Sequence, residues 1–206
     1  MKLILLNTLL IVNYNCFTLN FKNSWFNSGS SSSITNTLPK SASDLKLPQD
    51  NNYKAYNSTL NTSYGIILDA GSTGTRLFIY EWDPPKSCHY SPYVRGSKFR
   101  SGPREGKQIK IKKIGGLHNV DPSNVKEYLQ EFLDFALDYV PKEQHHRTPI
   151  ALLATAGMRI IPRARSSDII DQVKLNLNST GFYFDKTYGA IVIPGEYEGV
   201  FGWLAT

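Results

Sequence analysis

The stretch Tyr64-Gly-Ile-Ile-Leu-Asp-Ala-Gly-Ser-Thr-Gly-Thr-Arg-Leu-Phe-Ile-Tyr-Glu-Trp82 decides the fold. Residues 64–70 and 75–82 are two apolar runs rich in β-branched and aromatic side chains, which predicts two strands. The four residues between them, Gly71-Ser-Thr-Gly74, are typical of a tight turn, so we expect a hairpin. Asp83-Pro-Pro85 ends the second strand, because proline cannot donate a ladder hydrogen bond.

Strands and helices alternate after this hairpin, in the order β-β-β-α-β-α-β-α. This order predicts an α/β fold in which a mixed sheet is covered by helices. The periodicity of the apolar residues and the cap signals place the elements. We expect a strand near residues 108–114, a helix from Asp121-Pro122 to Pro141, a strand at 149–155, a helix at 161–177, a strand at 190–193 and the start of a helix at 196–206.

The composition excludes several classes of protein. Hydrophobic residues make up 41% of the 206 residues and aromatic residues 12%, enough for a real core, so the chain as a whole is not disordered. Its two cysteines exclude a disulfide-stapled miniprotein and a four-cysteine zinc site. The net charge of +6 comes from one stretch, because residues 95–113 carry eight basic side chains and one acidic one, Glu105.

This basic stretch predicts a charged edge strand and its loop, since lysines alternate with isoleucines near its end. The alternative is a patch that attracts anionic phosphates or lipid headgroups. A nucleic-acid-binding surface would need interleaved aromatic residues, and only Phe99 lies inside the stretch. We therefore expect no nucleic-acid partner.

The N-terminal 62 residues differ in amino-acid composition from the rest of the chain. One lysine and an apolar run at residues 3–12 indicate a secretory signal peptide, or a signal anchor that holds the membrane through residues 3–17. The alternative is a buried strand or helix of a cytosolic domain. Residues 18–62 are predicted to be a flexible Ser/Asn-rich linker, because they hold too few apolar residues to offset their ordering entropy. The folded domain then covers residues 63–206.

Three N-x-S/T sequons, at Asn57, Asn61 and Asn178, favour a lumenal or extracellular glycoprotein. Together with the leader they predict the secretory pathway. Cleavage after Cys16 would leave Cys88 as a free thiol or with a partner outside the chain.

The strongest chemical signal is Asp69-Ala-Gly-Ser-Thr-Gly-Thr-Arg76, between the first two strands. Its glycines let backbone N–H groups approach an anion, and Ser72, Thr73 and Thr75 add hydroxyls. Asp69 at the strand end can hold a divalent metal ion through water. The loop can therefore cradle phosphates without a Walker motif, the alternative being an ordinary hairpin turn.

Two further segments follow the ends of buried strands. Ala154-Thr-Ala-Gly-Met-Arg159 has small residues that let a ligand approach, and Thr155 could orient a water or contact phosphate. In Pro194-Gly-Glu-Tyr-Glu-Gly-Val-Phe-Gly-Trp203, Glu198 could accept a proton from an attacking water. The alternatives are plain packing for the first segment and a helix-cap acid for the second.

Together the three segments resemble three conserved regions of the apyrase family, the nucleoside triphosphate diphosphohydrolases, in the same order. Residues 139–162 are most similar to the endomembrane branch, whose members act in the Golgi or lysosomal lumen. The resemblance covers roughly residues 64–206 and implies the first of two ribonuclease-H-like domains of the actin and hexokinase superfamily.

The resemblance also implies an activity and a set of site residues. The activity is the Ca²⁺- or Mg²⁺-dependent release of terminal phosphate from nucleoside di- and triphosphates of the UDP, GDP and ATP class. Asp69 would hold the metal's water shell, Thr155 would help to place the attacking water and Glu198 would be the general base. The phosphate-binding residues would be Ser72, Thr73, Gly74, Thr75, Ala156 and Gly157.

The family's second phosphate loop and its nucleoside-base contacts have no counterpart in the 206 residues. We therefore expect this chain to be an N-terminal piece of an apyrase that is inactive alone, since phosphoryl transfer needs both walls of the cleft. One alternative is a short secreted or anchored protein that binds phosphate or a partner without turnover. Another is a sugar or acetate kinase of the same superfamily.

Overall fold

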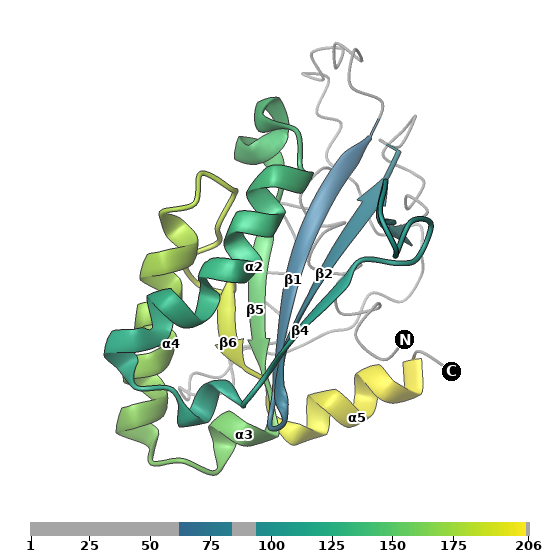
Figure 1. Ribbon diagram of the computed structural model, residues 1–206. Helices are drawn as coiled ribbons and strands as arrows, with labels where there is room; N and C mark the ends of the chain where they lie inside the picture. Colours follow the sequence, from purple (N-terminus) through teal and green to yellow (C-terminus); the bar gives the residue numbers. More distant parts are fainter. Residues whose placement is uncertain (1–61, 84–93, 205–206) are drawn as a thin grey trace, which may run out of the picture.

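A computed structural model describes residues 62–83 and 94–204 (Figure 1). The predicted leader at residues 1–17 and all but the last residue of the predicted linker lie outside these ranges, as do Cys88 and the sequons at Asn57 and Asn61. The third sequon is described: Asn178 is the last residue of a helix and is exposed, as a glycan acceptor must be.

The predicted hairpin is confirmed. Strand β1 (Ser63–Gly71) pairs antiparallel with β2 (Gly74–Trp82), and Asp69 lies opposite Arg76. The turn requires glycine at position 74, because the backbone φ angle there is +149°. A side chain on Gly74 would also collide with the backbone carbonyl of Lys113 on the neighbouring strand.

Four more strands complete a mixed sheet whose main path has the order β3-β2-β1-β5-β6. Strand β4 (Lys110–Ile114) pairs antiparallel with the turn-proximal half of β2, which confirms the predicted edge strand, and β3 (Arg95–Gly96) pairs with its far half. Strands β5 (Ile150–Ala154) and β6 (Ala190–Val192) run parallel to β1. This sheet, with helical crossovers to its parallel strands, confirms the ribonuclease-H-like α/β fold.

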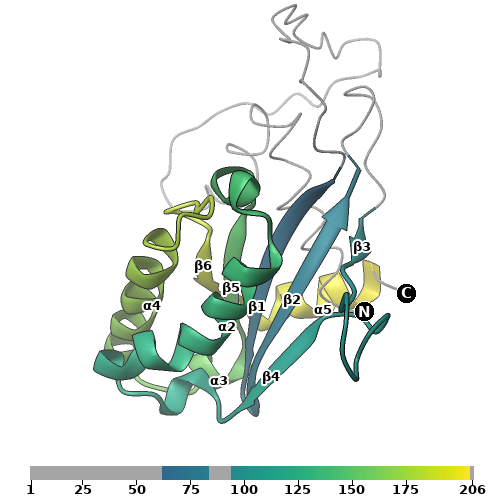
Figure 2. The same cartoon turned by 45° about the horizontal axis from the view of Figure 1, so that its top comes forward.

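The two long helices cover one face of the sheet (Figures 1 and 2). Helix α2 (Val125–Tyr139) follows a short 3₁₀ turn (Pro122–Asn124) whose cap is Asp121, and helix α4 (Arg163–Asn178) packs beside it. Between helices and sheet lies the main core, which includes the fully buried Phe132. The other helices of the described residues are the 3₁₀ segments Leu117–Asn119 and Lys142–Arg147, the short α3 (Ala156–Arg159) and α5 (Gly195–Leu204).

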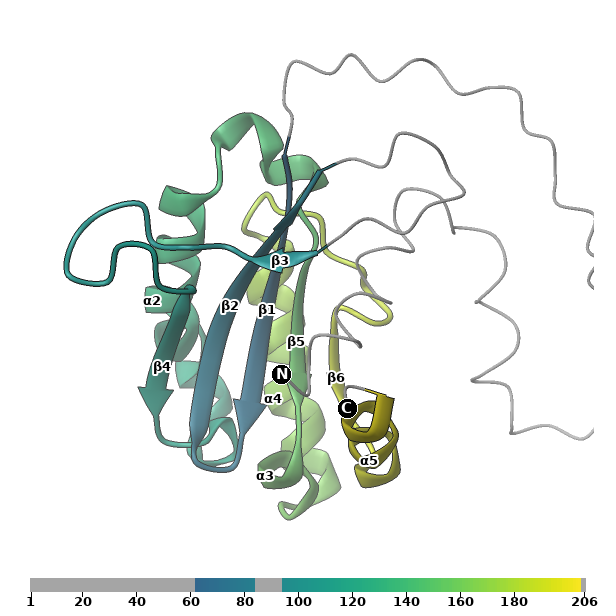
Figure 3. The same cartoon turned by 90° about the vertical axis from the view of Figure 1, so that its right-hand side faces the viewer.

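Neither α2 nor α4 covers the other face of the sheet, and α5 extends away from the lower end of β6 (Figures 1 and 3). A small apolar cluster that includes Ile67, Tyr80 and Leu153 lies on this face. Strand alternation places Asp69, which lies two residues after Ile67, on the same face. In residues 62–83 and 94–204, no helix has the length and apolarity needed to cross a membrane.

Candidate functional site

The hairpin turn presents two of its predicted phosphate-binding residues to solvent. Ser72 and Thr73 are exposed at the tip of the turn. The side chain of Thr75 points the other way, toward helix α2, and is fully buried. Its hydroxyl lies 2.8 Å from the hydroxyl of Tyr128. The Thr75 hydroxyl is therefore turned away from the solvent-exposed tip of the hairpin.

Helix α2 braces this turn from behind. The Tyr128 hydroxyl lies 2.8 Å from the backbone carbonyl oxygen of Gly115. The N–H of Gly115 in turn donates to the carbonyl of Thr73 over 3.3 Å. A phenol has one hydrogen and a carbonyl only accepts, so Tyr128 donates to Gly115 and accepts from the Thr75 hydroxyl. The sequence analysis did not identify Tyr128, because its contact with the turn spans 53 residues.

The second predicted segment lies against the first. Thr155 follows β5, and its N–H donates to the carbonyl of Ala70 over 3.1 Å. The side chain of Thr155 is 8% exposed, and its hydroxyl has only a long 3.5 Å contact to the same carbonyl. Thr155 is thus next to Asp69, at the ends of the adjacent parallel strands β1 and β5.

Gly157 in α3 makes the close contact between the two loops. A Cβ atom added to Gly157 would lie 3.1 Å from Ser72 Cα and 2.5 Å from Nδ1 of His118. The imidazole of His118 therefore fills the space between the two loops, and its Nδ1 is buried without a hydrogen-bond partner among the described residues. His118 belongs to no motif, so the sequence analysis missed it.

The third predicted segment is tied to the second by an ion pair. Glu198, in the first turn of α5, accepts from Arg159 Nη2 over 2.7 Å at its Oε2 atom. Arg159 also donates from Nη1 to the carbonyl of Ile193, at the end of β6, over 2.6 Å. The Glu198 side chain stays 36% exposed, so it remains accessible to a ligand or water. Glu196 in the same turn is exposed and has no ion pair within the described part of the chain.

Asp69 occupies the centre of this arrangement. It lies 3.5 Å from the guanidinium of Arg76, and its side chain is 18% exposed. Burial raises the pKa of Asp69 above its usual value; the Arg76 charge opposes this and the Glu198 charge reinforces it. Glu198 is therefore within electrostatic reach of Asp69. The structure thus brings all three predicted segments to one end of the sheet.

The carboxylate of Asp69 suits a hard divalent cation that keeps most of its water and phosphate ligands. Across residues 62–83 and 94–204, no three His, Cys, Asp or Glu side chains converge into a metal-binding cluster. A Mg²⁺ or weakly held Ca²⁺ ion does not need such a cluster, because waters and substrate phosphates complete a shell begun by one or two carboxylates. The partly buried carboxylate of Asp69, on the strand that leads into the exposed turn at Ser72 and Thr73, fits that role.

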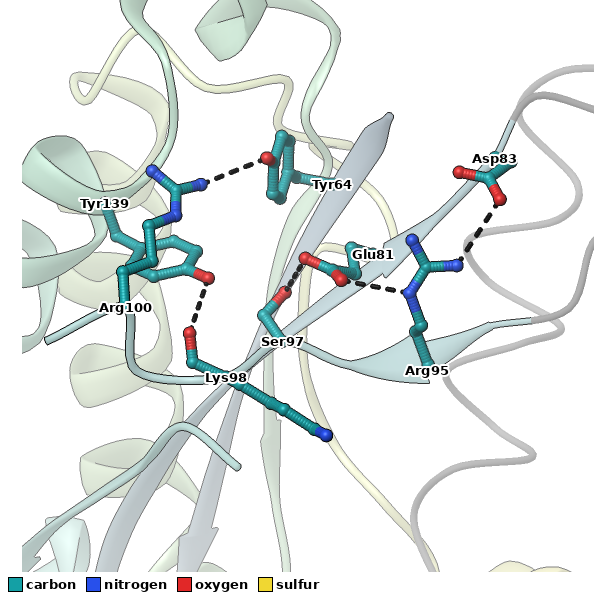
Figure 4. Close-up of polar contacts among 8 residues, drawn as sticks. All are labelled: Tyr64, Glu81, Asp83, Arg95, Ser97, Lys98, Arg100 and Tyr139. Atoms are coloured by element: carbon teal, nitrogen blue, oxygen red, sulfur yellow. Dashed lines mark hydrogen bonds and ion pairs between the residues drawn. The ribbon is translucent and has the colours of Figure 1, made fainter. Parts of the chain in front are cut away.

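A separate hollow of about 690 Å³ lies at the opposite end of β2. Arg95, one of its basic residues, is held by two ion pairs (Figure 4): it contacts Glu81 at 3.0 Å and Asp83 at 3.4 Å. Arg100 lies over the ring of Tyr139, with its guanidinium carbon 4.4 Å from the ring centroid. These contacts hold the loop after β3 against the sheet, and most of the predicted basic stretch is accordingly an edge strand and its loop.

Comparisons with known proteins find similar sequences in one family. A family model described as GDA1/CD39 (nucleoside phosphatase) matches residues 55–206. The chain is 33% identical over 147 residues to human "Ectonucleoside triphosphate diphosphohydrolase 4" and 37% identical over 152 residues to "Golgi apyrase" of Schizosaccharomyces pombe. These alignments cover 70% and 69% of this chain but 23% and 26% of the relatives, so the chain spans about a quarter of their length.

Solved structures give weaker matches. An Aquifex aeolicus member of the Ppx/GppA family has a TM-score of 0.41 at 16% identity, covering 70% of this chain and 39% of that one. A nucleoside triphosphate hydrolase from Neospora caninum has a TM-score of 0.39 at 10% identity, covering 65% and 28%.

Proposed function

The chain belongs to the GDA1/CD39 (nucleoside phosphatase) family, and from this premise we propose that it forms one wall of a site that releases the terminal phosphate of nucleoside di- and triphosphates. Since the chain spans about a quarter of its relatives' length, the activity is proposed for a protein that contains this domain. The observation that carries the proposal is the meeting of three segments, joined by the Arg159–Glu198 ion pair and the contact of Gly157 with Ser72.

In this proposal Glu198 is the general base. Its carboxylate is fixed by Arg159 yet partly exposed, so a water molecule could lie between it and the bound phosphate. Glu198 would accept the proton of that water as the oxygen attacks phosphorus. The Thr155 hydroxyl, which has only one long contact, would help to orient the water.

The hairpin turn and the start of α3 would hold the phosphate. The exposed residues Ser72 and Thr73 would contact the phosphate oxygens through their hydroxyls, and the buried Gly74 and Thr75 would hold the turn in the shape that presents them. Ala156 and Gly157, which have no bulky side chains, would let the phosphate approach the second loop. Such preorganised donors stabilise the charge that develops during transfer.

Asp69 would hold a Ca²⁺ or Mg²⁺ ion through water. A divalent ion supplies charge neutralisation at phosphate oxygens. The substrates would be nucleotides of the UDP, GDP and ATP class. We further propose a secretory-pathway location, lumenal or extracellular, because the relatives include "Golgi apyrase" and "Ectonucleoside triphosphate diphosphohydrolase 4". The leader would be cleaved or would remain as a membrane anchor.

The test is phosphate release by a protein that contains this domain, measured with UDP, GDP and ATP, with and without Ca²⁺ or Mg²⁺. Glu198→Gln should lower kcat by about 10²- to 10⁴-fold, the usual contribution of a general base. Glu196→Gln is the matched control, because it removes the same charge from the same helical turn. Equal losses in the two variants, or full activity of Glu198→Gln, would contradict the proposed base. Binding of nucleotides without hydrolysis would instead favour a non-catalytic binding protein.

A further inference from the structure

Two lysines of the edge strand β4 lie on the same face of the sheet as Asp69. In the strand register Asp69 is opposite Arg76 on β2, and Arg76 is opposite Lys112 on β4. Directly paired residues on neighbouring strands share a face, so these three side chains form one row across the sheet. Lys110, two residues before Lys112, lies on that face too, opposite Phe78.

The alternate residues of β4 confirm this orientation. Ile111 packs against the main core beneath the helices. Lys113 Nζ donates to the carbonyl oxygen of Tyr128 in α2 over 3.1 Å. Because Ile111 and Lys113 point to the helix-covered face, Lys110 and Lys112 point to the opposite one, where Asp69 lies.

The charges of Lys110 and Lys112 are not used elsewhere in the described structure. Both side chains are exposed, and neither takes part in an ion pair within residues 62–83 and 94–204. Arg95, in the same basic stretch, is by contrast paired with Glu81 and Asp83.

Distance permits these lysines to act on an anion at the turn. Neighbouring strands are about 4.8 Å apart, so the backbone of Lys112 is about 10 Å from that of Asp69 across two strand spacings. A lysine carries its charge on a flexible four-carbon stem, which covers much of that distance. An anion that extends from the turn over this face would meet the two ammonium groups.

We propose that Lys110 and Lys112 form an anion subsite that binds the inner phosphates of a chain whose terminal phosphate lies on the Ser72–Thr75 turn. The inference deepens the proposed function and rests on it: it names condensed phosphates, rather than single phosphate groups, as the ligands for which this face is built. Lysine suits this role as a compact point charge for phosphate oxygens. Lysines on an edge strand can also serve to prevent pairing with another chain. That role would not require Lys110 and Lys112 to lie on the same face of the sheet as Asp69.

The experiment measures binding of inorganic tripolyphosphate and of orthophosphate to the 206-residue chain by calorimetry. Lys110→Met with Lys112→Met should weaken tripolyphosphate binding about tenfold, a change of about 1.4 kcal/mol, and orthophosphate binding less than about twofold. The matched control is Lys98→Met with Lys107→Met, which removes two exposed cations from the loop of the same basic stretch. The control pair should stay within about twofold, and Lys110→Arg with Lys112→Arg should retain binding.

Three results would overturn the subsite: equal losses in the control pair, equal losses for both anions, or no preference of the unaltered chain for tripolyphosphate. Because all four lysines are exposed, none of the variants should unfold the chain. The binding readout also separates this inference from the proposed activity. Lysine-dependent tripolyphosphate binding by this chain, together with no nucleotide hydrolysis by a longer protein that contains this domain, would support the subsite and reject the phosphohydrolase. Glu198-dependent hydrolysis without any effect of the lysines on binding would reject only the subsite.

Discussion

The guanidinium of Arg159 lies 2.7 Å from Glu198 Oε2 and 2.6 Å from the carbonyl oxygen of Ile193. One side chain therefore ties the second segment to the end of β6 and to the start of α5. The geometry gives Arg159 a positioning role: it holds the proposed base at a set distance from the turn. Arg159 makes these contacts with residues more than 30 positions further along the chain, so no local sequence pattern could predict its positioning role.

Replacing Arg159 by methionine should lower kcat for phosphate release by about tenfold to a hundredfold while KM changes little. The reason is that a misplaced catalytic group costs rate even when it is chemically intact. Arg163→Met is the control, since Arg163 is an exposed cation at the start of α4. Arg159→Lys should recover part of the rate. A loss that appears only in KM would show that Arg159 binds substrate instead.

Tyr128→Phe should destabilise the fold by about 1–3 kcal/mol, because it leaves the buried Thr75 hydroxyl and the Gly115 carbonyl without their partner. Urea unfolding measures this. Tyr139→Phe removes the same atom from the same helix, but its bond to the Lys98 carbonyl is exposed, so its cost should be below about 1 kcal/mol.

The pairing with Thr75 can be isolated by a double-mutant cycle. Thr75→Val removes the buried hydroxyl, so Thr75→Val with Tyr128→Phe should cost less than the sum of the two single variants. Strict additivity would show that the two hydroxyls do not interact. In the same variants phosphate affinity should fall, since the Gly115 contact braces the turn at Thr73.

Local signals account for the parts of the fold that the sequence predicted. The hairpin followed from two apolar runs around Gly71-Ser-Thr-Gly74, and helix α2 from its apolar spacing and the Asp121-Pro122 start. Strand β3 was missed because two residues carry no periodicity. The pattern that predicts each of these elements lies within a few neighbouring residues, so one sequence is enough to predict most of them.

The sequence predicted which three segments form the candidate site, but it did not predict the side-chain contacts between them. Three strand-end motifs predicted that Asp69, Thr155 and Glu198 would share one end of the sheet, as the structure shows. The burial of the Thr75 hydroxyl depends on which face of β2 the helices cover, and the insertion of His118 depends on the approach of two loops. Both are consequences of tertiary packing, which no motif encodes.

The N-terminal cap of the 3₁₀ turn Pro122–Asn124, Asp121, should make stability depend on pH. Hydrogen bonds from the Ser123 hydroxyl and N–H hold the pKa of Asp121 below its usual value. A depressed pKa in the folded state means that the cap stabilises the fold at neutral pH. This stabilisation is lost as the pH falls through the folded-state pKa.

Asp121→Ala should therefore lower Tm at pH 7, and the difference from the unaltered chain should shrink below the usual pKa of aspartate, about 3.9. Asp134→Ala is the comparison, because Asp134 is an exposed acid within α2 that caps no backbone group. A Tm difference for Asp121→Ala that is constant from pH 7 to pH 2 would show that the charge plays no part in the cap.

The close approach of the two loops at Gly157 yields a prediction that a compensating change can rescue. Gly157→Ala places a Cβ 2.5 Å from His118 Nδ1, closer than real Cβ contacts, so it should destabilise the fold by about 1–3 kcal/mol. Adding His118→Ala removes the obstructing ring, so the double variant should be more stable than Gly157→Ala alone. Recovery should be partial, because Ser72 Cα still lies 3.1 Å from the new atom.

Gly199→Ala provides the control for this cycle. Position 199 lies within helix α5, and a Cβ there would meet nothing within 4 Å, so the change should be neutral or stabilising by up to about 1 kcal/mol. If Gly157→Ala is as well tolerated as Gly199→Ala, the two loops are not in close contact. If His118→Ala fails to rescue it, the obstruction comes from the Ser72 backbone. The turn that carries Ser72 would then be held against α3 by its main chain rather than by the imidazole between them.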